Sequence, residues 1–168
     1  MNKIRHLIYA LLLIGIDQLT KLLAVARLKG QESISIIPEV LRLYYHENTG
    51  AAWGIMSDNT TLLALFSVVV LCVMIFFYFK LPNEKHYNYL RLVIVFLTAG
   101  AIGNLIDRIT RNYVVDFIYF ELIDFPIFNV ADMYVTVSAT CLVLLTIFYY
   151  KDDDFNFLSK KDRAKNEG

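Results

Sequence analysis

Four runs of apolar residues dominate the chain, and short polar segments separate them. The runs cover residues 7–26, 62–79, 92–106 and 133–150, and the last three contain no charged residue. An α-helix rises about 1.5 Å per residue, so about 20 apolar residues cross the hydrocarbon of a bilayer. The pattern predicts four transmembrane helices. Because the first run carries Asp17 and Lys21 and no small-residue cleavage site follows it, we expect a helix there and not a signal peptide.

The polar segments differ in their patterns. Residues 30–59 include alternating positions rich in β-formers, which predicts short strands, with Pro38 keeping one of them short or at an edge. Residues 151–168 are charged and polar, which indicates a disordered cytoplasmic tail. The predicted architecture is an all-α membrane protein: a four-transmembrane-helix bundle with a small extracytoplasmic β-cradle over about residues 30–59. Residues 1–150 are expected to form one integral membrane domain.

Lysine and arginine are divided unequally between the two sides of the predicted bundle. Loops rich in these residues stay in the cytoplasm, so we expect both termini there and residues 30–59 and 114–132 outside. The richer side holds Lys3, Arg5, Lys80, Lys85, Arg91, Lys151, Lys160, Lys161, Arg163 and Lys165, and the other side holds Arg27, Lys29, Arg42, Arg108 and Arg111.

Composition narrows the classes of function. Hydrophobic residues make up 57% of the 168 positions, the mean hydropathy is +0.50 and the formal net charge is +0. This balance gives no indication of nucleic-acid binding. Cys72 and Cys141 each lie inside an apolar run, and His46 and His86 have no helically spaced partner, so neither a disulfide nor a metal site is predicted.

The stretch from Val114 to Asp132 carries the main indication of chemistry. Asp116 and Asp132 lie among apolar residues just outside predicted helices. Two carboxylates ~4 Å apart in an effective dielectric of ~20 repel by ~4 kcal/mol, so one keeps a proton while the other ionises. Such a pair supplies an acid and a base at the same pH. Glu121 and Asp124 compete for the same role, and spacing alone does not rank the four acids.

Other polar residues fall within or beside the predicted helices, and each has a structural interpretation as well. Asp17 and Lys21 share a helix face as an ion pair that fixes packing or, alternatively, contact substrate. Asn129 is suited to capping the fourth helix, and Asp116 to pairing with Arg108 or Arg111. A stripe at the end of the third helix allows close helix packing or substrate contact; its members are Gly100, Gly103, Asn104, Asp107 and Arg108.

Five short motifs occur in order along the chain, and together they are specific. The chain resembles the lipoprotein signal peptidase (signal peptidase II) family over nearly its whole length. The motifs are Asp17-Gln-Leu-Thr-Lys21, Glu47-Asn-Thr-Gly-Ala-Ala-Trp-Gly54, Gly100-Ala-Ile-Gly-Asn-Leu-Ile-Asp-Arg108, Val114-Val-Asp-Phe-Ile118 and Phe128-Asn-Val-Ala-Asp132.

The resemblance implies an aspartyl endopeptidase of the bacterial cytoplasmic membrane, with Asp116 and Asp132 as its catalytic dyad near the extracytoplasmic face. The implied substrates are diacylglyceryl-modified prolipoproteins, cut immediately before the lipid-modified cysteine, without a cofactor or a metal. We expect a monomer surrounded by membrane lipids, with no nucleic-acid partner. Expected substrate-binding residues are Asn48, Gly50, Asn104, Arg108 and Asn129, and expected supporting residues are Asp17, Lys21, Asp107, Gly100 and Gly103.

Two other classes of function fit the sequence less well. In a small proton-coupled transporter, Asp17 and Lys21 would be relay residues, but the acids gather at one interface and no inverted repeat is evident. A non-catalytic membrane adaptor would not need paired acids at one depth.

Overall fold

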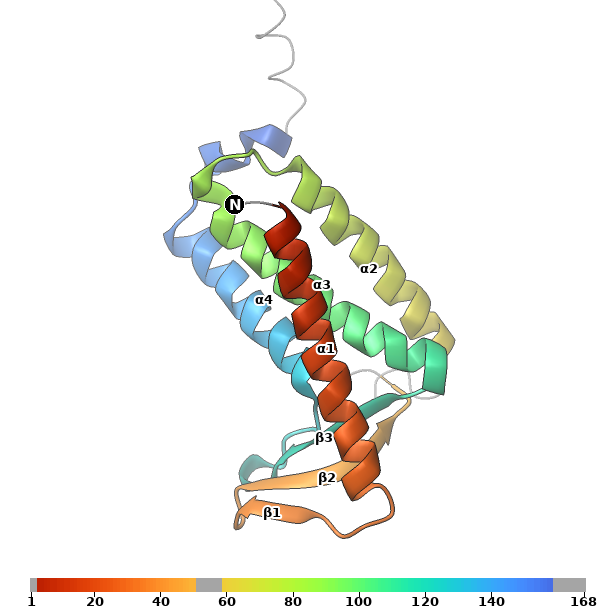
Figure 1. Cartoon of the computed structure of the whole chain (residues 1–168). Helices are drawn as coiled ribbons and strands as arrows, with labels where there is room; N and C mark the ends of the chain where they lie inside the picture. The colour runs from red at the N-terminus through yellow and green to blue at the C-terminus, as the bar shows by residue number, and fades with distance from the viewer. Residues whose placement is uncertain (1–2, 51–58, 159–168) are drawn as a thin grey trace, which may run out of the picture.

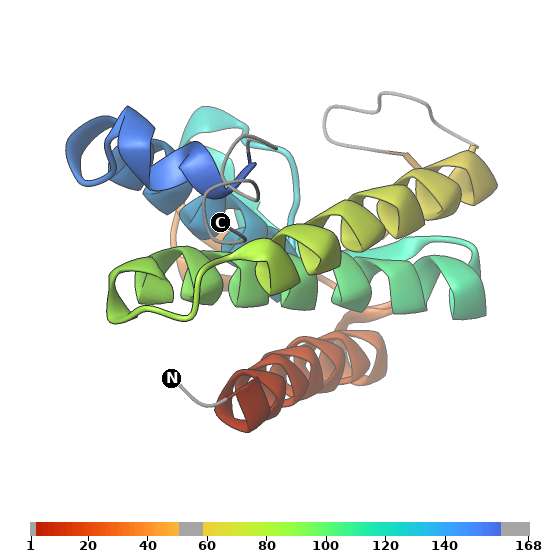
Figure 2. The ribbon, with the colours of Figure 1, turned by 90° about the horizontal axis from the view of Figure 1, so that it is seen from above.

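In the computed structural model, residues 3–50 and 59–158 are described. They include four helices that are long and apolar enough to cross a membrane, namely α1 (Lys3–Leu28), α2 (Thr60–Lys80), α3 (Asn88–Arg111) and α4 (Val130–Phe148). α3 packs against each of the other three helices and lies at the centre of the bundle (Figure 2). The prediction of four apolar helices is confirmed, and several of them extend beyond the apolar runs.

A small antiparallel sheet closes one end of the bundle (Figure 1). Its strands are β1 (Ile34–Ile37), β2 (Leu41–Asn48) and β3 (Val114–Phe120), in the order β1-β2-β3. The strands predicted within residues 30–59 are therefore confirmed, while positions 51–58 of that segment, with Trp53, lie outside the described residues. β3 comes from the stretch that holds the candidate acids, and its pairing places Asp116 opposite His46.

α1 fixes the sheet to the bundle. Its 26 residues extend for about 39 Å, which exceeds the ~30 Å hydrocarbon thickness. The excess length brings Ala24 and Leu28 into a buried cluster with Val115 and Phe117 of β3. The strand that carries Asp116 is thereby packed against the last turns of α1.

Three short 3-10 helices complete the described chain: η2 (Lys85–Tyr87), η3 (Glu121–Ile123) and η4 (Asp152–Leu158). η4 lies where the sequence indicates disorder. It is docked because the Tyr87 hydroxyl donates to the Asp154 carbonyl at 2.8 Å, and His86 lies 3.0 Å from the Asp154 carboxylate. Residues 159–168 of the predicted tail lie outside the described residues. The start of α1 and η4 both lie at the end of the bundle opposite the sheet (Figure 1).

Polarity is distributed as in a membrane protein. Large apolar side chains face outward along α1, α2 and α4, as Leu11, Phe66 and Val137 illustrate with about 60% of their surface exposed. In contrast, Asp17 and Lys21 have no exposed surface. Charge inside a membrane is tolerated where it faces the bundle interior and is paired, so functional polar groups are expected in the interior of this bundle.

Candidate active site

Asp116 is held on β3 by two side-chain amides. Only 1% of its surface is exposed. Its Oδ2 accepts a hydrogen bond from Asn48 Nδ2 at 2.8 Å, and its Oδ1 accepts one from Asn129 Nδ2 at 2.6 Å. These partners replace the pairing with Arg108 or Arg111 that the sequence allowed. Arg111 instead lies 3.5 Å from Asp107.

Asp132 occupies the first turn of α4, where a capping box fixes it. Asn129 Oδ1 accepts from the Asp132 backbone N–H, and Asp132 Oδ2 accepts from the Asn129 backbone N–H, each at 3.0 Å. This reciprocal arrangement satisfies two N–H groups that a helix start leaves free. The second carboxylate oxygen, Oδ1, accepts from Asn104 Nδ2 at 2.8 Å. The capping role predicted for Asn129 is confirmed.

Two asparagines join the aspartates into one network. The side-chain amide of Asn129 donates both to Asp116 and, at 3.1 Å, to Asn104 Oδ1. Asn104 in turn donates to Asp132. Each aspartate therefore receives an amide hydrogen bond from one of two asparagines that are bonded to each other, so β3, α3 and α4 present both carboxylates to one space.

That space is a cavity of about 790 Å³, the catalytic cavity, lined from both the sheet and the bundle. Asn48, Asp116, Asn104 and Asp132 contribute its polar wall. The remaining wall is largely apolar; it includes Phe125, Pro126, Ile127, Phe128, Met133, Val135 and Val137. An apolar cavity with a few convergent polar groups is the usual form of a ligand site.

Burial and the neighbouring acid change the titration of Asp116. Desolvation disfavours its charged form, and the negative charge of Asp132 adds to that effect, so the pKa of Asp116 rises from 3.8 to about 7. The hydrogen bonds from Asn48 and Asn129 act in the opposite direction and are smaller. At neutral pH this pair can hold one proton, which is the arrangement required for combined acid and base catalysis.

A buried charge cluster lies behind the polar wall. Lys21 Nζ is 2.9 Å from Asp17 Oδ2 and 3.2 Å from Asp107 Oδ2, and all three side chains have no exposed surface. The predicted pair of Asp17 and Lys21 is confirmed. The same ammonium donates to Asn104 Oδ1 at 2.8 Å, which leaves the Asn104 amide nitrogen directed at Asp132.

The two carboxylates of this cluster also hold the elements that carry the candidate acids. Asp17 Oδ1 accepts from the Ala131 backbone N–H at 2.9 Å, at the start of α4. Asp107 Oδ2 accepts from the Val115 backbone N–H at 3.1 Å, next to Asp116 on β3. Sequence reasoning did not single out Gln18, whose Nε2 donates to the Gly103 carbonyl at 3.1 Å and joins α1 to α3. Its signal in the sequence was its place in the motif Asp17-Gln-Leu-Thr-Lys21.

Close backbone approach brings α3 against α4. A Cβ built on Gly100 would lie 2.6 Å from the Ala131 carbonyl oxygen and 2.8 Å from Val135 Cγ2. A Cβ on Gly103 would collide with the Asp17 carboxylate. Both glycines therefore allow close helix packing, Gly100 against α4 and Gly103 against α1, as the packing interpretation predicts.

Gly100→Ala is expected to destabilise the protein by about 1–3 kcal/mol, since it overpacks a backbone contact. It should also lower activity, because α4 carries Asp132. Thermal unfolding in detergent would measure the first effect and peptide cleavage the second. Gly15→Ala is the matched control: nothing lies within 4 Å of its Cβ position, so the change should be neutral or stabilising by up to about 1 kcal/mol. Equal melting temperatures for the two variants would contradict the close-contact explanation.

The other predicted residues lie at the edge of the cavity. Arg108 Nη2 donates to the Gly50 carbonyl at 3.3 Å, and the Gly50 backbone N–H donates to Asn48 Oδ1 at 2.9 Å. This chain of contacts orients the Asn48 amide nitrogen toward Asp116. Among residues 3–50 and 59–158, no group of three or more His, Cys, Asp or Glu side chains is arranged to hold a metal ion.

The competing acids lie at the far end of β3. Glu121 pairs with Arg42 at 3.0 Å, and Asp124 accepts a 2.6 Å hydrogen bond from the Tyr119 hydroxyl. Neither lines the catalytic cavity. The geometry thus separates Asp116 and Asp132 from the two alternatives that spacing left open.

Sequence comparisons identify one family, and solved structures share the fold. The family model described as Signal peptidase (SPase) II matches residues 9–148. A lipoprotein signal peptidase from Clostridium tetani is 40% identical over 89% of this chain and 95% of its own length, and one from Staphylococcus aureus is 36% identical over 94% and 92%. A solved bacterial membrane enzyme superposes with a TM-score of 0.76 at 30% identity, covering 88% of this chain and 92% of that one. A second has a TM-score of 0.74 at 32% identity, covering 87% and 94%.

Proposed function

This chain belongs to the signal peptidase II family and cleaves lipoprotein signal peptides, and from that premise we propose that Asp116 and Asp132 perform the hydrolysis as an aspartyl pair. The observation that carries the proposal is their shared amide network on one wall of the catalytic cavity. The transporter alternative finds no support among the relatives.

The proposed reaction uses one ionised and one protonated aspartate. The ionised carboxylate takes a proton from a water molecule held between the pair, and that water attacks the scissile carbonyl carbon. The protonated carboxyl group hydrogen-bonds the carbonyl oxygen as negative charge develops there. A proton then passes to the leaving amine as the peptide bond breaks. The two aspartates titrate as a coupled pair, so the role of initial base is assigned to the pair and not to either residue.

The surrounding amides have proposed roles in this reaction. Asn104 and Asn129 orient the carboxylates, because each donates to one of them and they bond to each other. Asn48 restrains the second oxygen of Asp116. Gly50 and Arg108 form the rim of the cavity where the peptide would enter.

The shape of the cavity favours a lipid-modified substrate. Its bundle side contains apolar positions of α4, and Met133, Val135 and Val137 are exposed there. Acyl chains placed beside these residues would remain in the hydrocarbon while the scissile bond reaches the aspartates. The proposed substrate is a prolipoprotein with a diacylglyceryl cysteine, cut immediately before that cysteine.

The proposed orientation follows from charge and span number. Four spans place both termini on one side, and the basic loops assign that side to the cytoplasm. The sheet and the catalytic cavity would then face the extracytoplasmic surface of a bacterial membrane. Cysteine labelling at Glu39, which is exposed between β1 and β2, would test this from outside intact cells.

Cleavage of matched peptides tests the proposed function. The detergent-solubilised protein would receive one synthetic signal peptide with a diacylglyceryl cysteine and the same peptide with an unmodified cysteine. We expect a single cut before the modified cysteine and at most slow cleavage of the unmodified peptide. A well-folded protein that cuts neither peptide, or cuts elsewhere, would overturn the proposal.

The pH profile is a second expected outcome. Below about pH 7 Asp116 keeps its proton, and as the pH rises through that value Asp116 loses the carboxyl proton that could be donated to the carbonyl oxygen. kcat/KM should therefore fall on the alkaline side with an apparent pKa near that value. The same raised pKa contributes stability that is fully present below pH 3.8 and lost as the pH rises through about 7. A rate that stays constant from pH 6 to 9 would contradict the assignment.

A further inference from the structure

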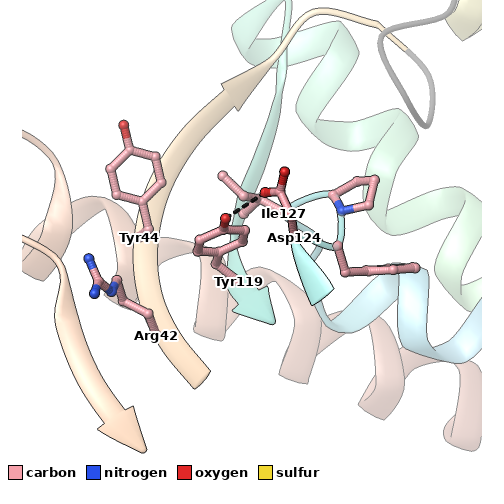
Figure 3. A pocket seen from close by; sticks show the side chains of 7 residues that line it. Arg42, Tyr44, Tyr119, Asp124 and Ile127 are labelled. Atoms are coloured by element: carbon pink, nitrogen blue, oxygen red, sulfur yellow. Dashed lines mark hydrogen bonds between the residues drawn. The ribbon is translucent and has the colours of Figure 1, made fainter. Parts of the chain in front are cut away.

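A second pocket, the outer pocket, lies beside the catalytic cavity, and the reaction proposed above does not use it. Its volume is about 490 Å³. Four polar side chains line it, and Figure 3 shows the Tyr119 hydroxyl directed at the Asp124 carboxylate. These four residues are Arg42, Tyr44, Tyr119 and Asp124.

The two cavities share one wall. Phe125, Pro126 and Ile127 line both of them. Hydrogen bonds hold this segment to β3: the Phe125 N–H donates to the Phe120 carbonyl at 3.1 Å, and the Phe128 N–H to the Ile118 carbonyl at 3.0 Å. The two cavities are therefore adjacent, with this hydrogen-bonded segment between them.

The position of the outer pocket distinguishes the two halves of a substrate. All of its lining residues lie on β2, on β3 or between β3 and α4, outside the four apolar helices. The catalytic cavity, in contrast, reaches α3 and α4. A signal peptide and acyl chains belong to the membrane side, so the polypeptide that follows the lipid-modified cysteine belongs to the sheet side.

The chemistry of the pocket fits a neutral polar peptide. It holds one cationic and one anionic side chain, Arg42 and Asp124, so it has no net charge to select a phosphate or a strongly charged ligand. Arg42 Nη2 is engaged by Glu121 at 3.0 Å. Carboxylate and hydroxyl oxygens can accept from peptide N–H groups, and hydroxyls can donate to peptide carbonyls.

We infer that the outer pocket binds the first residues of the mature lipoprotein, those directly after the lipid-modified cysteine, as a polar and uncharged segment. This inference rests on the proposed function. An extended peptide advances by about 3.3–3.6 Å per residue, so a few residues suffice to pass from one cavity to the next.

The test compares two lipidated substrates that share one signal peptide. One ends at the modified cysteine as a carboxamide, and the other continues for six uncharged polar residues. We expect the wild-type protein to have a KM for the longer substrate lower by about threefold to tenfold, the effect of one or two added hydrogen bonds. Tyr44→Ala and Asp124→Asn should remove this advantage and leave cleavage of the short substrate unchanged.

Tyr44 is suited to this test because 46% of its surface is exposed, so truncating it should leave the melting temperature unchanged. Tyr89→Ala is the matched control: Tyr89 is 53% exposed in the first turn of α3 and does not line the outer pocket, so the preference should persist in that variant. Equal KM values for both substrates in the wild type would overturn the inference. So would a preference that survives in both pocket variants. Failure to cut the short lipidated substrate at all would instead contradict the proposed function.

Discussion

Asp116→Asn and Asp132→Asn should each lower kcat/KM for a lipidated signal peptide by more than about a thousandfold, because positioned acid–base groups contribute about 10²–10⁴ each and this reaction needs both. Asparagine keeps the size of the side chain but cannot take or give a proton at neutral pH. Steady-state cleavage measured by chromatography of the peptide products would give the ratio. Cleavage at the wild-type rate in either variant would refute the dyad.

Folding controls are needed because both aspartates are structural acceptors. Asn104 Oδ1 already accepts hydrogen bonds from Lys21 and Asn129, so Asn104 can only donate to the side chain at position 132. Asp132 accepts with both oxygens, from Asn104 and from the Asn129 backbone N–H. Asparagine at position 132 has one oxygen, so one of these two donors would lose its acceptor. Such a loss costs about 1–3 kcal/mol, which thermal unfolding in detergent would reveal. Glu121→Gln is the matched catalytic control. It removes a competing acid outside the cavity, and cleavage of the short substrate should persist.

The second large effect is expected for stability. Among the described residues, Lys21 is the only cation paired with Asp17, and Lys21→Met removes it. The same change removes one of the cations paired with Asp107, which keeps its contact with Arg111. Removing one partner of a buried ion pair typically costs about 3–5 kcal/mol, because the other charge stays buried without compensation. We expect a large fall in melting temperature. Activity should fall as well, since Asn104 would lose the contact that orients it toward Asp132.

Lys29→Met is the matched control for this change. Lys29 Nζ also lies within ion-pair distance of an acid, Glu47, at 2.8 Å, but the two side chains are 52% and 40% exposed. Exposed pairs contribute less than about 1 kcal/mol, so this variant should melt close to the wild type. A similar fall in melting temperature for Lys21→Met and Lys29→Met would contradict the explanation that burial makes the Lys21 ion pair important. Adding Asp17→Asn to Lys21→Met should recover part of the lost stability.

Hydrophobic patterning alone is enough to predict the helices and the strands within residues 30–59. A membrane-spanning helix must be long and apolar over consecutive residues, and alternation along a strand is likewise a local property. Residue type and spacing also predicted the ion pair of Asp17 with Lys21 and the capping role of Asn129. In both cases the partners lie only three or four positions apart in the sequence. The docking of η4 was missed, since it depends on contacts with Tyr87 and His86.

Contacts between distant segments determine the site itself. Asp116 and Asp132 were not separable from Glu121 and Asp124 by spacing, because all four lie within one short stretch of sequence. Backbone hydrogen bonds between Phe128 and Ile118 bring the chain back along β3, and only the folded arrangement gives two of the acids amide partners. Lys21 meets Asn104 across 83 positions. Burial and hydrogen-bond geometry, which set the pKa of Asp116, exist only where segments far apart in the chain pack together.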